Sequence, residues 1–380
     1  MPPIVIDLKK ADDRRDVVHR AVQTLAEGQL VVFPTETVYG VGACARHAAG
    51  IDKIFAAKGR SHQAPLVLAI KSAEEALDYV PGLSRLAERL ARRCWPGPIT
   101  LVVDLPEVAG ESGNEGLLAQ LPENVQRAVA PDGTLGLRVP AHNTILDILG
   151  MLAGPIVLTS ANLSGEPAAI TAEEAIKSLG DQVALVLDDG PCRYGQASSV
   201  VQTTGDKCRC IREGVVSQSA LDRLSSMVVL LVCTGNTCRS PMAEIVMRHL
   251  VAEKMNCQES ELDQRGVIIA SAGIAAVSAC APSGEAVEVM KERGMDLSRH
   301  VSQPLTDKLV RHADIILTLT VGHRHALTRR WPECAQRTHT LRRDGGDIND
   351  PIGGSIAVYR ECAEQITSSL QEQVAEIDFS

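Results

Sequence analysis

The chain has very few aromatic residues. Phe, Tyr and Trp make up 2% of its 380 residues, although 45% of the residues are hydrophobic. Any core must therefore be packed mainly by aliphatic side chains, and the stacking platforms that hold single-stranded nucleic acid are disfavoured. The formal net charge of −9 also argues against a general binder of polyanions, although it is compatible with a local basic site.

Long apolar runs and a cysteine framework are also missing. No stretch of about 18 uninterrupted apolar residues occurs, and the N-terminal segment MPPIVIDLKKADDRRD lacks the apolar centre of a signal peptide. The eleven cysteines follow no regular spacing, which argues against a disulfide scaffold. Neither Cys208 with Cys210 nor His323 with His325 has convincing metal-ligand spacing. We expect a cytoplasmic protein that does not enter a membrane and has no protein-bound metal.

The length of the chain predicts two or three domains. No internal repeat or low-complexity tract occurs. A short polar segment, VVSQSALDRLSSM at residues 215–227, separates two groups of strand and helix patterns. We therefore expect a first domain at residues 1–217, a linker at 218–227 and a second domain at 228–380.

The most informative segment is VVLLVCTGNTCRSPMAE at residues 228–244, where a buried strand leads into a thiol-containing loop and then a helix. Five residues separate Cys233 from Arg239, so the loop must curl into a cradle of inward-pointing backbone N–H groups, and Gly235 is expected to tolerate positive φ there. The cradle opens onto a helix that begins near Ser240, whose dipole favours an anion. Arg239 adds a planar fork of donors for phosphate oxygens.

The chemistry that fits this loop is nucleophilic phosphoryl transfer. Cys233 is expected to be a thiolate, because a helix N-terminus and a nearby cation favour the charged form of a cysteine. Such a transfer also needs an acid for the leaving group. Asp350, in GDINDPIGGS, is the candidate, because the proline and glycines after it suit a loop that presents a carboxylate. Asp347 is a second choice.

The segment from Met227 to about Ala375 resembles the low-molecular-weight protein tyrosine phosphatase family. The Cys-x5-Arg-Ser loop and the Asp-Pro carry the resemblance, and Ser271-Ala272-Gly273 and His300 support it. The resemblance implies a flavodoxin-like parallel sheet with helices on both faces.

The same resemblance implies a role for each residue of the loop. Cys233 would form a phosphocysteine, Arg239 would bind the phosphoryl oxygens, and Asp350 would be the general acid. Ser240 would steady the thiolate, and Asn236 would brace the loop.

The substrate of this loop is open between three alternatives. Tyrosine-specific members of the family usually have a bulky aliphatic residue where this chain has Thr237, and an aromatic residue where it has Ile352. Thr237 resembles the protein-arginine phosphatase branch, so we favour phosphoarginine over phosphotyrosine. Arsenate reduction needs closely spaced resolving cysteines, which this chain lacks downstream of the loop. Cys238 could also close a reversible disulfide with Cys233.

The N-terminal half places polar residues at the ends of apolar, strand-like runs. The segments are FPTETVYG, LGLRVPAH and VLTSANLSGEP, together with IDKIFAAKGR, a predicted helix that stops at Gly59. Such strand ends form a polar cleft at one edge of an α/β sheet. Its arginines, lysines and hydroxyls suit a polyphosphate together with an amino-acid carboxylate.

This ordered set of motifs, with WPGPITLVV, QASSVV and IREG, resembles the YrdC/Sua5 family of threonylcarbamoyl-AMP synthases over residues 10–217. The resemblance implies a twisted open α/β sheet. It also implies that L-threonine, bicarbonate and ATP react to give L-threonylcarbamoyladenylate and pyrophosphate, which feeds the N6-threonylcarbamoyl modification of adenosine 37 in tRNA. Mg²⁺ is expected with ATP, and no cofactor is expected to be tightly bound.

The synthase resemblance assigns two groups of residues. The threonine site would consist of Thr37, Arg138 and Ser160. The ATP site would consist of Lys58, Arg60, Thr134, Asn162, Thr171 and Arg212. Ala64 and Ala69 depart from the family, because some members carry Asn and His at these positions.

The whole sequence thus favours a bifunctional enzyme, a nucleotidyltransferase fused to a phosphatase. Its expected partners are a phosphorylated protein and the transferase machinery that modifies tRNA. The alternative is a phosphotyrosine phosphatase whose N-terminal half is a regulatory module that binds nucleotide or RNA. The retained Arg60, Arg138, Asn162 and Arg212 favour an active synthase. No pattern indicates an oligomeric state.

Overall fold

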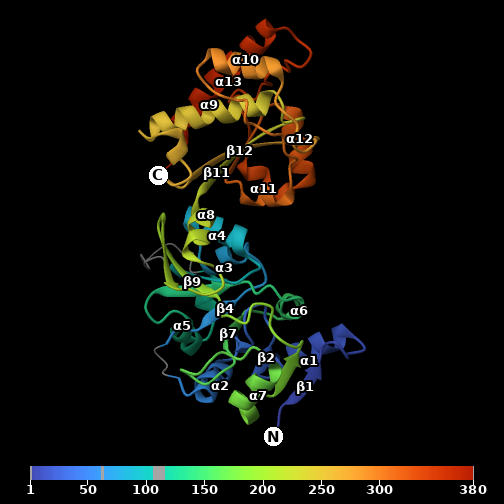
Figure 1. Ribbon diagram of the computed structural model, residues 1–380. Coiled ribbons are helices and arrows are strands. Elements are labelled where there is room, and N and C mark those ends of the chain that lie inside the picture. Colours follow the sequence, from blue (N-terminus) through green and yellow to red (C-terminus); the bar gives the residue numbers. More distant parts are fainter. Residues whose placement is uncertain (1, 61–63, 106–115, 380) are drawn as a thin grey trace. The chain divides into compact units, whose positions relative to one another are not determined.

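The computed structural model describes residues 2–60, 64–105 and 116–379. The chain divides into two compact units, Met1–Leu224 and Ser225–Ser380 (Figure 1). This division falls inside the segment that was predicted as a linker. That segment contains helix α8 (Gln218–Ser225), whose Leu221 is buried in the core of the first unit. Whether each unit behaves as an independent domain stays a prediction.

The first unit is built on a mixed sheet of ten strands, in the order β1-β8-β2-β3-β7-β4-β6-β5-β9-β10. The strands are β1 (Ile4–Asp7), β2 (Val31–Phe33), β3 (Gly40–Cys44), β4 (Val67–Ala69), β5 (Ile99–Asp104), β6 (Thr134–Arg138), β7 (Ile156–Ser160), β8 (Leu185–Asp188), β9 (Ser199–Thr204) and β10 (Lys207–Arg212). The helices are α1 (Arg14–Ala26), α2 (Ala48–Lys58), α3 (Ala76–Tyr79), α4 (Arg85–Cys94), α5 (Glu123–Val129), α6 (Asn143–Met151) and α7 (Ala172–Leu179), with short 3₁₀ turns at Leu117–Gln120 and Gly180–Gln182.

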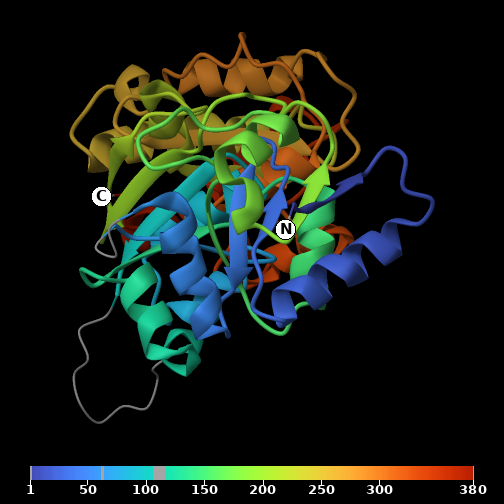
Figure 2. The same cartoon turned by 90° about the horizontal axis from the view of Figure 1, so that it is seen from below.

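Both faces of this sheet are covered. Val157 of β7 belongs to one hydrophobic cluster, whereas its neighbours Ile156 and Leu158 belong to another, because successive side chains of a strand point to opposite faces. Helices α1 and α6 lie side by side on one face (Figure 2), and α2, α4 and α5 contribute to the cluster on the other. The unit is therefore the open, twisted α/β sheet that the sequence predicted.

The second unit is built on four parallel strands in the order β12-β11-β13-β14. The strands are β11 (Met227–Cys233), β12 (Val267–Gly273), β13 (Ile315–Thr318) and β14 (Thr338–Thr340). The helices are α9 (Arg239–Lys254), α10 (Gly284–Glu292), α11 (Asp307–His312), α12 (Val321–Arg330) and α13 (Ile356–Glu376), with 3₁₀ turns at Glu259–Glu261 and Pro332–Arg337.

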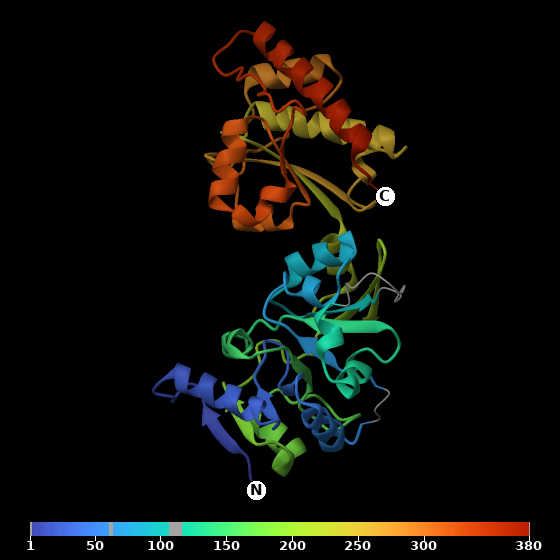
Figure 3. The same ribbon diagram turned by 180° about the vertical axis from the view of Figure 1, so that it is seen from behind.

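Helices lie on both faces of this parallel sheet. Figures 1 and 3 show α9, α10 and α13 together on one face, with α11 and α12 on the other. Val229 and Leu231 of β11 pack in the first of these layers, and Leu230 and Val232 pack in the second. The predicted flavodoxin-like arrangement is confirmed. It places the end of the central strand β11 at the sheet edge where α/β proteins bind ligands.

No helix among the described residues combines the length and the hydropathy that a membrane span requires.

Candidate active sites

The loop after β11 in the second unit holds the predicted nucleophile. Cys233 is the last residue of β11 and is 3% exposed, and α9 begins at Arg239, one residue before the predicted start. The Cys233 Sγ lies 2.9 Å from Ser240 Oγ and accepts a hydrogen bond from the backbone N–H of Asn236 at 3.2 Å. The sulfur thus has two polar neighbours, the backbone N–H of Asn236 and the hydroxyl of Ser240.

The positive φ of this loop lies at Asn236 and not at Gly235, where we had expected it. Asn236 has a φ of 56°, a left-handed conformation that asparagine adopts more readily than most residues. Its Nδ2 donates to Ser240 Oγ at 2.9 Å and to Ser271 Oγ at 2.8 Å, and its Oδ1 accepts from the backbone N–H of Gln303 at 2.8 Å. These bonds fix the curled shape of the loop.

A second loop brings a carboxylate to the cradle. Arg239 Nη2 lies 2.5 Å from Asp350 Oδ2, and the guanidinium is buried while the Asp350 side chain is 46% exposed. Asp347, the second choice for the acid, accepts a hydrogen bond at 2.7 Å from the backbone N–H of Val321, the first residue of α12. Of the two carboxylates, Asp350 is the one that bonds to the cradle arginine.

The two residues that the sequence analysis links to substrate choice lie at accessible positions. Thr237 is partly exposed, and Ile352, just after the Asp-Pro, is 70% exposed. Cys238 is buried, with its Sγ 3.5 Å from the hydroxyl of Tyr359. Burial raises the pKa of Tyr359 to about 12, so its hydroxyl is neutral at pH 7. A disulfide between Cys233 and Cys238 stays a prediction.

Two further side chains touch the network, and the sequence analysis gave neither of them a role. Glu244 Oε2 accepts a hydrogen bond from Ser271 Oγ at 2.6 Å, and so is linked to Asn236 through the Ser271 hydroxyl. His323, on α12, has its Nε2 2.8 Å from Thr234 Oγ1 in the cradle. Burial, and secondly the charge of Arg239, lower the pKa of His323 to about 4, so its ring is neutral at pH 7. His300, a supporting match, contacts the carbonyl of Asn236 at 3.0 Å.

The first unit contains a cavity of about 450 Å³ beside the strand ends that carry the N-terminal motifs. Six of the nine residues predicted for the two substrate sites line it: Arg60, Thr134, Arg138, Ser160, Asn162 and Arg212. The other three, Thr37, Lys58 and Thr171, lie outside this lining. The fold therefore gathers into one cavity residues that lie up to 152 positions apart, from Arg60 to Arg212.

Arg138, the residue expected to bind the threonine carboxylate, is held by a buried ion pair. Its Nη2 lies 2.7 Å from Glu36 Oε1 and 2.8 Å from Thr37 Oγ1. Glu36 Oε2 in turn accepts from the backbone N–H of Ala141 at 2.9 Å. Thr37 is itself buried, with its hydroxyl bonded to the guanidinium. Sequence reasoning missed Glu36, although it stands inside FPTETVYG beside Thr37.

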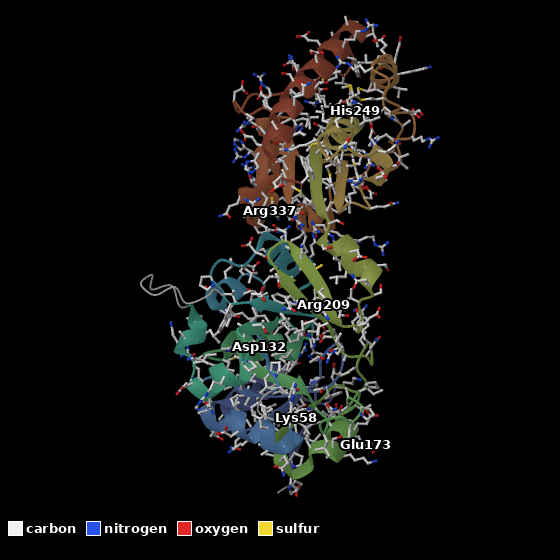
Figure 4. All side chains as sticks on the ribbon, turned by 90° about the vertical axis from the view of Figure 1, so that its left-hand side faces the viewer. Lys58, Asp132, Glu173, Arg209, His249 and Arg337 are labelled. Carbon is white, nitrogen blue, oxygen red and sulfur yellow. The ribbon has the colours of Figure 1, made fainter. Side chains whose placement is uncertain are left out.

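Lys58 holds the end of β7 together. Its Nζ donates to the carbonyl oxygens of Ser160 and Asn162, both at 2.6 Å, and it lies inside the first unit (Figure 4). Burial, and secondly the charge of Arg60, lower the pKa of Lys58 to about 8. Burial and the charge of Arg212 likewise lower the pKa of Arg60. Each of these cations lowers the pKa of a neighbouring cation. Positive charge is therefore concentrated where an anionic ligand would be stabilised.

The remaining predicted residues have local partners. Thr134 Oγ1 donates to Asp132 Oδ1 at 2.7 Å, and Thr171 caps α7 by accepting from the backbone N–H of Glu174. Their contacts with a nucleotide stay predictions. Ala69 is paired with Arg138 across β4 and β6, so a larger family side chain at this position would stand beside the guanidinium.

Comparison with known proteins identifies the first unit. Residues 23–214, about half of the chain, match the Sua5, YciO and YrdC family model, whose description is "Telomere recombination". The chain belongs to the Sua5/YrdC family. A putative threonylcarbamoyl-AMP synthase of Mycobacterium tuberculosis is 34% identical over 212 residues, which cover 56% of this chain and 90% of that protein. A solved Sua5 structure from Pyrococcus abyssi has a TM-score of 0.51 and 25% identity, and covers 71% of this chain and 91% of its own.

The second unit of this Sua5/YrdC-family chain is a low-molecular-weight phosphatase region. Residues 228–379 match the family model "Low molecular weight phosphotyrosine protein phosphatase". Two solved structures are each 33% identical and each cover 40% of this chain. They are the arginine phosphatase YwlE of Geobacillus stearothermophilus (TM-score 0.35, 92% of that chain) and a tyrosine phosphatase of T. tengcongensis (TM-score 0.36, 100% of that chain). The predicted fusion is confirmed, and the chain is an enzyme with a synthase region and a phosphatase region.

Proposed function

We propose that the synthase region joins L-threonine, bicarbonate and ATP to give L-threonylcarbamoyladenylate and pyrophosphate for the modification of adenosine 37 in tRNA. The observation that carries this proposal is the cavity that brings Arg60, Arg138 and Arg212 together with small hydroxyl and amide side chains. The name of the M. tuberculosis relative, a putative threonylcarbamoyl-AMP synthase, supports it.

This site would accelerate the reaction by positioning the substrates and neutralising their negative charges. The threonine amine attacks the bicarbonate carbon and water leaves, and the resulting carbamate oxygen attacks the α-phosphorus of ATP as pyrophosphate departs. Arg138, oriented by Glu36, binds the threonine carboxylate, while Arg60 and Arg212 bind the phosphate chain. Mg²⁺ would enter with ATP and would neutralise charge on the phosphate oxygens.

The test of the synthase is pyrophosphate release by the full chain. We expect release to require both threonine and bicarbonate. Arg138→Ala should raise the KM for threonine at least about tenfold, because a charged partner is removed. Arg209→Ala is the matched control, since Arg209 is an exposed arginine on β10 (Figure 4). Binding of ATP and threonine with only background pyrophosphate release would instead favour a regulatory nucleotide-binding module.

We propose that the phosphatase region works through a phosphocysteine. The Cys233 thiolate attacks phosphorus, the bond to the leaving group breaks, and Asp350 protonates the leaving atom. Water then attacks the phosphocysteine, Asp350 takes the proton, and phosphate leaves with the thiolate restored. The contact between Arg239 and Asp350 supports the choice of Asp350, because its carboxyl group lies beside the arginine that would bind the phosphoryl oxygens.

We further propose phosphoarginine as the substrate. Thr237 is small, polar and partly exposed at the cradle, and nothing aromatic stands at Ile352 to stack on a phenol ring. The full chain should therefore hydrolyse phosphoarginine faster than phosphotyrosine, and Thr237→Ile should reverse or abolish that preference. Cys233→Ser should abolish both reactions and leave pyrophosphate release unchanged. Faster phosphotyrosine turnover by the unaltered chain would refute the phosphoarginine assignment.

We also propose a cytoplasmic location, since the reactive thiolate needs a reducing compartment. The proposed partners are a phosphorylated protein, which is the substrate of the phosphatase region, and the transferase that consumes the adenylate.

A further inference from the structure

The first turn of α12 lies between the two loops of the phosphatase site. On one side, Asp347 accepts a hydrogen bond from the backbone N–H of Val321. The backbone N–H of Ile348, the next residue, donates to the carbonyl of Leu319 at 2.8 Å. Arg239 Nη1 reaches the carbonyl of Ile348 at 3.4 Å. The loop that carries Asp350 is therefore tied to the start of α12.

On its other side the same turn touches the nucleophile loop. His323 is the third residue of α12, and its backbone N–H donates to the capping hydroxyl of Thr320 at 3.1 Å. Its ring Nε2 lies 2.8 Å from the hydroxyl of Thr234, the residue that follows Cys233. The backbone carbonyl of Thr234 is held by the N–H of Ala275 at 3.0 Å. The imidazole of His323 thus links the first turn of α12 to the cradle.

Burial of the His323 ring is energetically unfavourable, which indicates that its contact with Thr234 has a function. His323 is 9% exposed, and its Nδ1 is buried with no hydrogen-bond partner among the residues that the structure describes. A buried polar atom in that state lowers stability, and an apolar side chain of similar size would avoid this cost. The charges that act on the ring are those of Arg239, which lowers its pKa, and of Asp350 and Asp347, which raise it. Because the ring is neutral, it can bond to Thr234 without adding a charge that competes with Arg239 for the phosphoryl group.

We propose that His323 is a positioning residue that holds the loop of the general acid in register with the loop of the nucleophile, through its contact with Thr234 and the tie of its helix to Asp347. The inference rests on the proposed role of Asp350 as the acid. It predicts that loss of the His323–Thr234 contact misplaces Asp350 relative to the leaving atom and leaves the attack by Cys233 largely intact.

The test compares two aryl phosphates in the full chain. Phenyl phosphate has a poor leaving group that needs the acid, whereas the p-nitrophenolate leaving group of p-nitrophenyl phosphate departs with little help. We expect His323→Leu and Thr234→Val to lower kcat/KM for phenyl phosphate by about 10- to 100-fold, and for p-nitrophenyl phosphate by less than about 3-fold. His323→Gln, whose amide can reach the Nε2 position, should restore most of the loss. His325→Leu, an exposed position on the same helix, is the matched control.

Four outcomes decide the inference. Selective loss with phenyl phosphate, shared by His323→Leu and Thr234→Val and non-additive in the double variant, supports it. Equal losses on both substrates would show a merely structural role and overturn the inference. The absence of any loss in Thr234→Val would also overturn it, because Thr234 is exposed and its substitution is not expected to cause misfolding. If Asp350→Asn itself fails to lower phenyl phosphate turnover selectively, the acid role of Asp350 falls, and the inference falls with it.

Discussion

Asn236 offers the sharpest test of how the phosphatase cradle is held. Asn236→Ala removes three buried hydrogen bonds, to Ser240, Ser271 and Gln303, each worth about 1 kcal/mol net. It also leaves alanine at a φ of 56°, which costs roughly 1–2 kcal/mol. We therefore expect the free energy of unfolding of the phosphatase region to fall by about 4 kcal/mol, or about a thousandfold in the unfolding equilibrium.

The assay is urea unfolding of the full chain, followed by tryptophan emission. The chain has two tryptophans, Trp95 in the first unit and Trp331, which is buried in the second. In a Trp95→Phe background, Trp331 reports on the phosphatase region alone. Asn236→Gly separates the two causes, because glycine relieves the backbone strain without restoring the side-chain bonds. We expect it to be more stable than Asn236→Ala by about 1 kcal/mol or less.

A loss smaller than about 1 kcal/mol in Asn236→Ala would refute the reasoning, because three buried bonds would then contribute almost nothing. Full recovery of stability in Asn236→Gly would refute the part assigned to the side chain. In either variant the synthase activity should be unchanged, because Asn236 lies in the other unit.

Three further predictions follow from single contacts. Glu36→Gln leaves the buried charge of Arg138 without its ion-pair partner, a change that costs about 3–5 kcal/mol in stability, and should raise the KM for threonine; an unchanged KM would contradict the positioning role of Glu36. In Gly273→Ala the added Cβ would lie 2.5 Å from the carbonyl oxygen of Thr234, so phosphatase kcat should fall about tenfold or more while pyrophosphate release is unchanged. The pKa of His323, about 4 against an ordinary 6.5, means that the unfolded chain binds the extra proton as the pH falls below 6.5. The phosphatase region should therefore lose stability from pH 6.5 down to about 4 in urea unfolding, and His323→Gln should flatten that slope.

Local patterns predicted both folds because each element carries its own signal. The apolar run of β11 and the glycine at the end of α2 are examples, and Gly59 indeed adopts a left-handed φ of 58°. The Cys-x5-Arg spacing sufficed to predict the curled loop, because five residues leave the backbone few ways to close. The position of positive φ was wrong, since the side-chain bonds of Asn236, which come from three other segments, decide which residue takes the left-handed conformation.

The contacts that sequence reasoning missed all join distant segments. Glu36 pairs with Arg138 across 102 positions, and His323 contacts Thr234 across 89 positions. A carboxylate in a turn and a histidine in a helix have ordinary structural roles in most proteins, so nothing local marks either residue.

The sequence alone determined the two families and the order of the two units, and it predicts Cys233 as the nucleophile, because those features reside in short motifs with fixed spacing. Tertiary structure decided how the reactive groups are held: which carboxylate bonds to Arg239, which residue orients Arg138, and what braces the cradle. These outcomes depend on burial and on hydrogen bonds between strands and loops far apart in the chain, and such bonds form only when the whole sheet is assembled.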